Sequence, residues 1–112
     1  MIRSDEEESS WIGAHSVIKG EILVDGLLKI EGKLIGSIKG LENSTVIIGQ
    51  SGYVQGNIEG SEVWIDGTVE GTIQTHSKVH ISRIGKIKGD IRSNQVTVDF
   101  GAIVDGSIAS LA

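Results

Sequence analysis

Six copies of one five-residue pattern follow one another along the chain, and this repetition limits the possible folds more than any other feature. Each copy has an aliphatic residue, any residue, glycine, any residue and isoleucine. Successive glycines are 15 to 20 residues apart, with a mean of about 17. A recurring period of this size is typical of a solenoid, in which one structural unit stacks on the next. The copies are IKGEI (18–22), LIGSI (34–38), VQGNI (54–58), VEGTI (69–73), IKGDI (87–91) and VDGSI (104–108).

A second aliphatic element precedes each copy after the first, as VWI (63–65) precedes VEGTI. Apolar and polar residues alternate within the repeat, which indicates strands, whereas helices need apolar spacings of three and four. Hairpins need tight turns and a spacing of about 8 to 12 residues, which these repeats exceed. The pattern predicts an all-β, single-domain parallel β-helix of about six windings, roughly 29 Å long at about 4.8 Å per winding. The expected windings are 12–27, 28–45, 46–62, 63–78, 79–95 and 96–112.

The alternation assigns four aliphatic side chains of a winding to the interior. Each fully buried side chain of this kind contributes about 1.5 to 3 kcal/mol, but a single winding cannot bury its own apolar face. The core is therefore expected to be a stack of aliphatic ladders completed by neighbouring windings. The predicted inward residues are Leu28, Ile30, Leu34 and Ile38; Val46, Ile48, Val54 and Ile58; Val63, Ile65, Val69 and Ile73; Val79, Ile81, Ile87 and Ile91; and Val96, Val98, Val104 and Ile108.

Gly71 lies on the inward side between Val69 and Ile73, although glycine weakens a strand. Its equivalents occur in all six windings. Two structural reasons are open: the coil bends too tightly for a side chain, or a bulge requires positive φ. A phosphate-binding loop is not indicated, because neither of the usual glycine-rich phosphate motifs is present.

The composition excludes several kinds of site and partner. Glycine accounts for 16 of 112 residues, about twice the usual level, and the absence of cysteine rules out disulfides and thiolate metal sites. The net charge of −5 and the lack of a basic patch argue against nucleic acid as a partner. No signal sequence or apolar run of about 18 residues is present, so a cytoplasmic protein is expected. Residues 1–10 carry a net charge of −3 and are predicted to be a disordered acidic tail before a β-helix domain at 11–112.

One outward column brings Ile47 next to Trp64. Either Trp64 is a partly covered surface residue, which is ordinary, or the pair makes a lateral contact with another molecule. The column consists of Lys29, Ile47, Trp64, His80 and Thr97.

The segments IDGTVEGTI (65–73), IEGKLIGSI (30–38) and VIIGQSGYVQGNI (46–58) resemble the repeats of the bactofilins, which are bacterial polymer-forming cytoskeletal proteins. The resemblance covers about residues 11–108. It implies a right-handed β-helix with a triangular core that assembles end to end into filaments without a nucleotide or other cofactor. It also implies a scaffold for cell shape, motility or envelope growth that works alongside peptidoglycan-modifying or other envelope proteins.

The two ends of such a coil present strand edges that proteins usually cover with a helix, prolines or charges. This sequence offers little of that, since GSIASLA (106–112) follows the last winding directly. Two open apolar ends are expected to stack on other copies. Phe100 makes an end contact, covers the core of its own winding, or does both. The candidate polymerisation residues are Trp11 and Ile12 at one end and Phe100, Ile103, Ile108 and Leu111 at the other.

The first ten residues, MIRSDEEESS, differ from the membrane-binding segment with which many bactofilins begin. Carboxylates disfavour an anionic leaflet, and Met1 with Ile2 supplies too little apolar surface to anchor the chain alone. Both features argue against membrane attachment, so a filament in the cytoplasm is expected, and one at the inner face of the cell membrane is the alternative.

Two other functions are open. A short-oligomer adaptor that recruits an envelope enzyme would also use the Trp64 surface. Left-handed β-helices include acyltransferases with a histidine base and trimeric carbonic anhydrases with three zinc-binding histidines, and this chain has His15, His76 and His80. Those folds need strict six-residue repeats, whereas these windings vary in length. The prediction is therefore a protein without catalytic residues, metal or cofactor.

Overall fold

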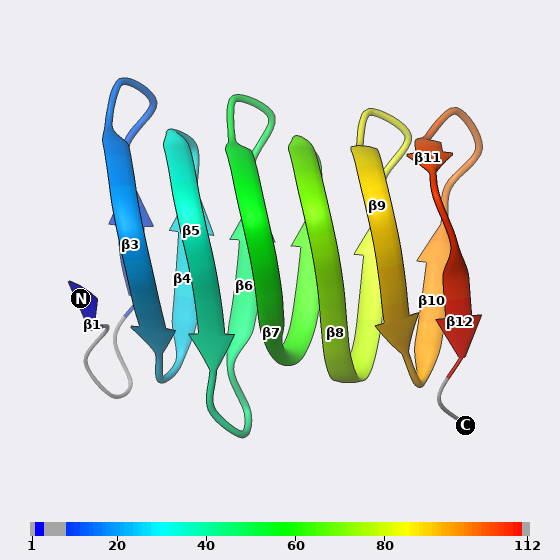
Figure 1. The fold of residues 1–112 in the computed structure, drawn as a ribbon, viewed down its shortest axis with the longest axis horizontal. Coiled ribbons are helices and arrows are strands. Elements are labelled where there is room, and N and C mark those ends of the chain that lie inside the picture. Colours follow the sequence, from blue (N-terminus) through cyan, green and yellow to red (C-terminus); the bar gives the residue numbers. More distant parts are fainter. Residues whose placement is uncertain (1, 4–8, 111–112) are drawn as a thin grey trace.

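The computed structural model is a right-handed coil of parallel strands and describes residues 2–3 and 9–110. In Figure 1 the strands in front run downward and those behind run upward as the chain passes from left to right. Every pairing is parallel, and twelve strands join in one sheet. The strands are β1 (Ile2–Arg3), β2 (Ser9–Ile12), β3 (Val17–Val24), β4 (Leu27–Ile30), β5 (Lys33–Gly40), β6 (Thr45–Ile48), β7 (Tyr53–Ile65), β8 (Thr68–Ile81), β9 (Lys86–Ser93), β10 (Gln95–Val98), β11 (Ile103–Asp105) and β12 (Ile108–Ser110).

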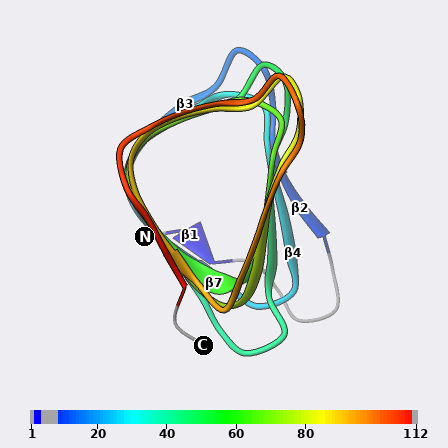
Figure 2. The ribbon, with the colours of Figure 1, turned by 90° about the vertical axis from the view of Figure 1, so that its right-hand side faces the viewer.

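Viewed along its axis, the coil has a triangular outline with three faces around one core (Figure 2). The opening face contains β2, β4, β6, the ends of β7 and β8, and β10. The pre-glycine face contains β11 and the parts of β3, β5, β7, β8 and β9 that precede the repeated glycine. The post-glycine face contains β1, the segments that follow the glycine, and β12. This arrangement confirms the predicted fold class.

The stack has about five turns, fewer than the six windings expected. Six repeats make five winding-to-winding steps on the pre-glycine face, where β3, β5, β7, β8, β9 and β11 follow one another. The last repeat has no successor to close a further turn, which explains the difference. The longest dimension of the molecule is 31 Å, close to the rod length of roughly 29 Å that the strand spacing predicts.

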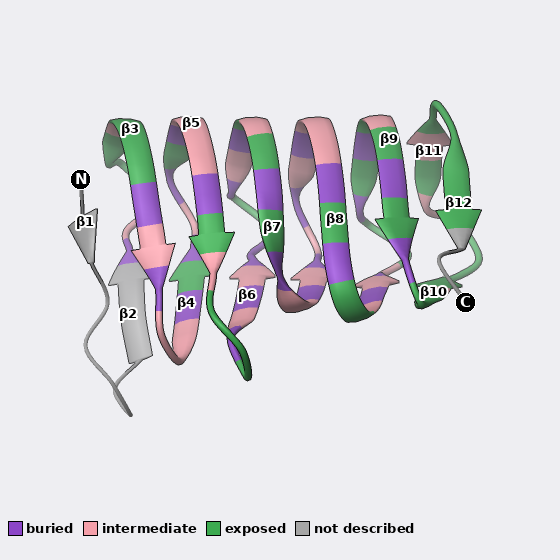
Figure 3. Cartoon of the chain, turned by 60° about the horizontal axis from the view of Figure 1, so that its bottom comes forward, coloured by how far each residue is buried: buried purple, intermediate pink, exposed green. Residues whose placement is uncertain are grey.

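The aliphatic ladders form the core as predicted. Val63, Ile65, Val69 and Ile73 are all completely buried, and their equivalents in the windings on either side are buried too. The last winding is different, because Ile108 is 47% exposed at a position that is buried in the preceding windings. Figure 3 shows this change at β12, which is largely green. Inward-facing side chains become buried only when another winding lies on top of them.

Three buried polar residues, Ser44, Thr75 and Ser93, lie where the post-glycine face turns into the opening face. The Thr75 hydroxyl donates to the Ser93 hydroxyl, and Ser93 Oγ donates to the backbone carbonyl of Gln95 at 2.7 Å. Hydrogen bonds of this kind offset the cost of burying hydroxyl groups. The repeat pattern did not reveal this corner, because it lies outside the repeated elements.

The repeated glycine has the positive φ that one of the two open reasons required, but there is no bulge, because the strand register runs unbroken through Gly56, Gly71 and Gly89. Gly71 has a φ of 139°, and its equivalents have φ values from 130° to 150°. A Cβ atom at Gly71 would lie 1.9 Å from the carbonyl oxygen of Gly56 in the preceding winding. The backbone therefore turns a corner in a conformation that side chains disfavour, and the neighbouring winding fills the space that a side chain would need.

Candidate functional site

The C-terminal end of the coil is an open apolar surface. Val98, Ile103 and Ile108 come from β10, β11 and β12, one from each face, and are 43%, 55% and 47% exposed. Val98 and Ile108 pair with buried residues and hold inward positions, whereas Ile103 pairs with Lys86 and lies in an outward column beside the end. No following winding pairs with these three strands in the chain that the structure describes. Their outer backbone groups form a strand edge on which another strand can pair. Leu111, the remaining residue proposed for this end, lies outside the described residues.

Phe100 extends from the turn that joins β10 to β11, the last turn at the upper right of Figure 1. Two backbone hydrogen bonds hold this turn: Asp99 N donates to Ile81 O at 2.9 Å, and Ala102 N donates to Asp99 O at 3.1 Å. The Phe100 side chain is 100% exposed. The alternative in which Phe100 covers the core of its own winding is therefore wrong. The ring is free to meet a surface outside this chain.

The N-terminal end differs from the expected boundary at residue 11. Strand β2 begins at Ser9, and β1 pairs with β3, so some residues assigned to a disordered tail are strands. Strands pair with an open sheet edge through backbone groups and do not need apolar side chains. The side-chain pattern of an acidic segment therefore does not predict such pairing. Trp11 pairs with Lys29 in register, and Ile12 is buried at 7% exposure. The Ile12 side chain at the N-terminal end is thus less exposed than the Ile108 side chain at the C-terminal end.

The candidate lateral contact lies on the opening face. In the strand register Ile47 is opposite Trp64, which is opposite His80, so the predicted outward column exists. Ile47 and Trp64 are both partly exposed. The rings of Trp64 and His80 stack with centroids 4.7 Å apart and planes inclined by 14°. The structure therefore places Ile47 next to Trp64, as predicted, but one face of the Trp64 ring is already packed against His80.

Charged groups surround the Trp64 ring. The Lys78 ammonium lies 5.1 Å from the ring centroid, a favourable position over the negative face of an indole. Glu62 accepts a hydrogen bond from Trp64 Nε1 and lies 3.7 Å from Lys78 Nζ. These contacts hold the indole in place at the surface, so the lateral face presents a fixed aromatic group with charges at its rim.

The three histidines do not come together. His15 lies in the turn before β3, His76 is exposed where β8 passes around a corner, and His80 lies on the opening face. Within residues 2–3 and 9–110, no three carboxylate or imidazole groups are placed so that they could hold a metal ion. None of the described residues belongs to a helix that could cross a lipid bilayer.

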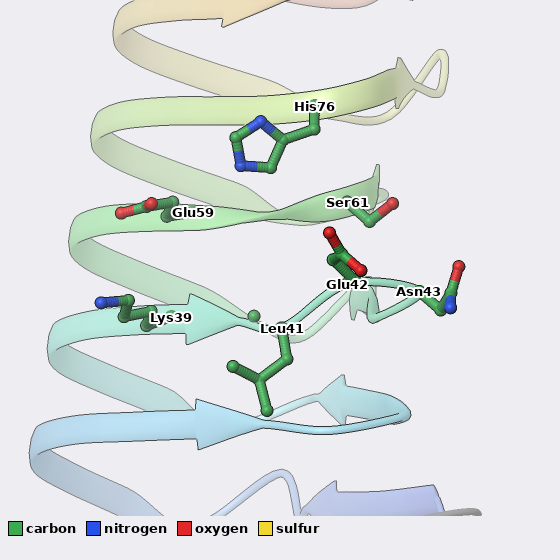
Figure 4. A pocket seen from close by; sticks show the side chains of 8 residues that line it. Lys39, Leu41, Glu42, Asn43, Glu59, Ser61 and His76 are labelled. Carbon is green, nitrogen blue, oxygen red and sulfur yellow. The ribbon is translucent and has the colours of Figure 1, made fainter.

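An open groove of about 470 Å³ lies beside the protruding loop between β5 and β6. Figure 4 shows the Glu42 and Asn43 side chains on this loop, with Ser61 and His76 on the following windings. The repeat pattern did not predict this groove. Its signal was present in the 20-residue step from Gly36 to Gly56, the longest in the series. The groove is lined by Lys39, Gly40, Leu41, Glu42, Asn43, Glu59, Ser61 and His76.

The pre-glycine face holds a polar pair between adjacent windings. The Tyr53 hydroxyl donates a hydrogen bond to the carboxylate of Glu70. This bond raises the pKa of Tyr53, because loss of the phenolic proton would break it and place two negative charges together. Lys33 Nζ lies 5.5 Å from the centre of the same ring. The pair links neighbouring windings.

Comparison with known proteins agrees with this geometry. The family model for bactofilins, described as polymer-forming cytoskeletal proteins, matches residues 10–109. Bactofilin BacO of Myxococcus xanthus is 36% identical over 97 residues, which are 87% of this chain and 75% of that protein. Bactofilin BacP of the same organism is 28% identical over 105 residues, or 94% of this chain and 43% of that protein. The chain thus spans less than half the length of BacP.

A solved structure has the same fold. It is a cryo-EM reconstruction of Thermus thermophilus bactofilin double helical filaments, with a TM-score of 0.76 and 23% sequence identity. The match covers 89% of this chain and 98% of the other. A parallel coil with an open apolar end, a family match across most of its length and a relative at 36% identity lead to one conclusion. This chain belongs to the bactofilin family of polymer-forming cytoskeletal proteins.

Proposed function

We propose that this chain is a non-enzymatic scaffold subunit that assembles end to end into filaments without nucleotide, mainly through its C-terminal end. The observation that carries the proposal is the last winding: within the described residues β10, β11 and β12 are paired on one edge only, aliphatic side chains are exposed beside them, and Phe100 is fully exposed. A second copy that stacks on this surface gains both backbone pairing and apolar burial. The N-terminal end, with Trp11 and Ile12, is the second contact surface in the filament.

In the cell, the proposed filament lies in the cytoplasm, either free or at the inner face of the membrane, and organises cell shape, envelope growth or motility. The partners proposed are peptidoglycan-modifying or other envelope proteins. Membership of a polymer-forming cytoskeletal family supports this role, and the groove beside Glu42 and His76 offers such a partner a polar surface outside the end contacts.

Salt-resistant polymerisation of the purified chain is the test of this function. We expect filaments in negative-stain electron microscopy and a sedimenting polymer without nucleotide or metal, both at about 0.1 M and at about 1 M salt. Across this range the screening length falls from about 10 Å to about 3 Å, which weakens charge contacts but leaves apolar ones intact. A compact trimer that binds zinc would contradict the proposal and support the histidine alternative.

A short-oligomer adaptor is the second candidate, because the two ends differ. Ile12 is buried at the N-terminal end, whereas Ile108 is exposed at the other, so a dimer joined through C-terminal ends would cover the exposed aliphatic side chains of the last winding. Sedimentation velocity separates the two functions. A discrete dimer that does not grow with concentration supports the adaptor, whereas a critical concentration followed by large polymers supports the filament.

Lateral association of filaments gives a separate prediction for Trp64. The Trp64→Ala substitution is expected to leave end-to-end filaments intact but to reduce their side-by-side pairing, because it removes the fixed aromatic group of the opening face. Filament widths in electron micrographs give the measurement. Thr97→Ala, in the same outward column, is the matched control. Equal widths for wild type and Trp64→Ala would show that this face makes no lateral contact.

A further inference from the structure

Two neighbouring turns carry large apolar side chains out of the coil. Residues 82–85 join β8 to β9, residues 99–102 join β10 to β11, and both turns project at the same corner of the coil (Figures 1 and 2). The side chains of Ile84 and Phe100 are exposed in these turns, and that of Ile103 is exposed at the start of β11. We name these three residues the apolar ridge.

The two turns lie against each other and are held by backbone hydrogen bonds. A Cβ atom on Gly101 would lie 3.5 Å from Arg83 Cβ. Gly85 N donates to Ser82 O at 2.9 Å within the first turn, and Ile103 N donates to Gly85 O at 3.1 Å between the windings. A surface that is already fixed loses little conformational freedom when a partner covers it. The ridge is therefore preorganised for a contact.

The coil does not need apolar residues in these turns. The long turns of the first and third repeats have the same backbone hydrogen bond between their first and fourth residues. In those turns His15 and Ser51 occupy the position of Ile84, and Gln50 occupies the position of Phe100. Polar residues thus fold into the same turn. The exposed apolar side chains of the last two long turns indicate a contact with another molecule.

Opposite charges flank the apolar ridge. Arg83 precedes Ile84 in one turn, Asp99 precedes Phe100 in the other, and both charged residues are exposed. Among the residues that the structure describes, no carboxylate forms an ion pair with Arg83. Asp99 Oδ2 lies 3.1 Å from His80 Nε2. An anionic lipid surface would attract Arg83 but repel Asp99, whereas a patch with both signs is complementary to a second copy of itself.

A second copy related by a two-fold axis satisfies both charges at once. In such a contact, residue i of one copy meets residue j of the other, and j meets i. Arg83 of each copy can then pair with Asp99 of the other on either side of the joined apolar side chains. An apolar centre with a polar rim is the usual anatomy of protein interfaces, and arginine–carboxylate pairs are among the stronger polar contacts.

We infer that the apolar ridge is a side-by-side contact between two copies of this chain, with Arg83 and Asp99 paired across it. The inference rests on the proposed filament, because three side chains bury far less than the roughly 1,200 Å² at the lower limit of stable interfaces. A filament presents one ridge per subunit, and repetition converts weak contacts into a firm association. Free subunits therefore do not pair through the ridge, but filaments do.

Ile84 isolates this contact from the two surfaces already described. Phe100 lies where the ridge meets the C-terminal end, so its substitution changes both surfaces. Ile84 belongs to the preceding winding, outside the terminal surface. Trp64 lies in the outward column of the opening face and not in these turns. The test therefore uses Ile84 and Arg83.

The first measurement is the fraction of filaments that are paired, counted in negative-stain electron micrographs well above the critical concentration. We expect Ile84→Asp to form filaments but to lower the paired fraction at least about tenfold, a change equivalent to the loss of one modest contact. Ser51→Asp adds the same charge at the equivalent position of a polar turn and is the matched control, which should pair like wild type.

Charge exchange tests the polar part of the contact. Arg83→Glu and Asp99→Arg are each expected to reduce pairing, because each brings like charges together across the two-fold axis. The double variant restores opposite charges and should recover pairing. Circular dichroism checks that all three variants fold.

Cross-linking gives a second readout, because the natural chain has no cysteine. Ile84→Cys supplies a single thiol in the centre of the proposed contact. A short bifunctional maleimide should join its filaments into covalent dimers of subunits. Ser51→Cys carries an equally exposed thiol in a turn outside the ridge and should give little dimer.

Equal paired fractions for wild type and Ile84→Asp, or no dimer from Ile84→Cys, would overturn the inference and leave the proposed filament intact. Loss of filaments themselves in Ile84→Asp would assign Ile84 to the end contact and would also overturn it. Binding of wild type to anionic vesicles that Ile84→Asp loses, with pairing unchanged, would assign the ridge to a lipid surface. A wild-type chain that does not polymerise contradicts the proposed function, and the inference fails with it.

Discussion

Replacing Phe100 with aspartate is expected to abolish filaments and leave a folded, soluble subunit. Because Phe100 is 100% exposed, the folded chain loses no packing, and the free energy of unfolding should change by less than about 0.5 kcal/mol. The end contact loses the burial of a phenylalanine, worth about 1.5 to 3 kcal/mol, and gains a carboxylate that must be desolvated. Together these effects raise the critical concentration by at least about a hundredfold, at about 1.4 kcal/mol per tenfold.

Pelleting, electron microscopy and circular dichroism measure this effect. Ile84→Asp is the matched control, because Ile84 is 44% exposed in the equivalent turn of the preceding winding and does not lie at the terminal surface. Phe100→Leu tests whether apolar area is sufficient and should retain filaments. Normal polymerisation of Phe100→Asp would contradict a C-terminal contact. Equal loss in Ile84→Asp would indicate a general effect of added negative charge.

The second large effect is on stability, in Gly71→Ala. The new Cβ would lie 1.9 Å from the carbonyl oxygen and 2.7 Å from the carbonyl carbon of Gly56. Both atoms are backbone, so no side chain can move aside. The positive φ of 139° adds strain of about 1 to 3 kcal/mol. We expect the free energy of unfolding to fall by more than about 4 kcal/mol, a large part of the 5 to 15 kcal/mol that is usual for a domain of roughly this size.

Gly20→Ala separates the two causes of this loss. Gly20 has a φ of 130°, close to that of Gly71, but no heavy atom lies within 4 Å of the position of its Cβ. The chain should therefore lose only the strain component, about 1 to 3 kcal/mol. Urea unfolding followed by circular dichroism, at concentrations too dilute for assembly, gives both values. Equal losses at the two positions would show that conformation, and not the close approach of windings, explains the glycine.

The predictions from the sequence succeeded where one rule repeats along the chain. Alternation with a period of two has the same meaning in every winding, so residue type alone assigns Val63 and Ile65, and likewise Val79 and Ile81, to the interior. The same regularity placed Ile47, Trp64 and His80 in one outward column. An assignment that is ambiguous in one repeat can be settled from the other repeats. The six repeats in order also made the resemblance to bactofilins specific.

The irregular parts could not be predicted in this way. The groove beside Glu42 depends on how far an inserted loop projects from the coil, and the buried corner at Thr75 and Ser93 depends on hydrogen bonds between windings. The predicted start of the coil was too late, because β1 and the first residues of β2 join the sheet through backbone pairing. Side-chain patterns contain no information about such pairing.

The sequence by itself determined that this chain is a stack of strands with an aliphatic core, because periodic burial is encoded in residue type. Only the tertiary structure explains why residue 71 is glycine, because a Cβ atom there would collide with the carbonyl oxygen of Gly56 in the preceding winding. It also excluded one of the two roles of Phe100, that of covering the core of its own winding, by leaving the ring fully exposed. The physical reason is the same in both cases: the space around a residue depends on the neighbouring winding, which lies against Gly71, whereas no winding of the described residues packs on Phe100.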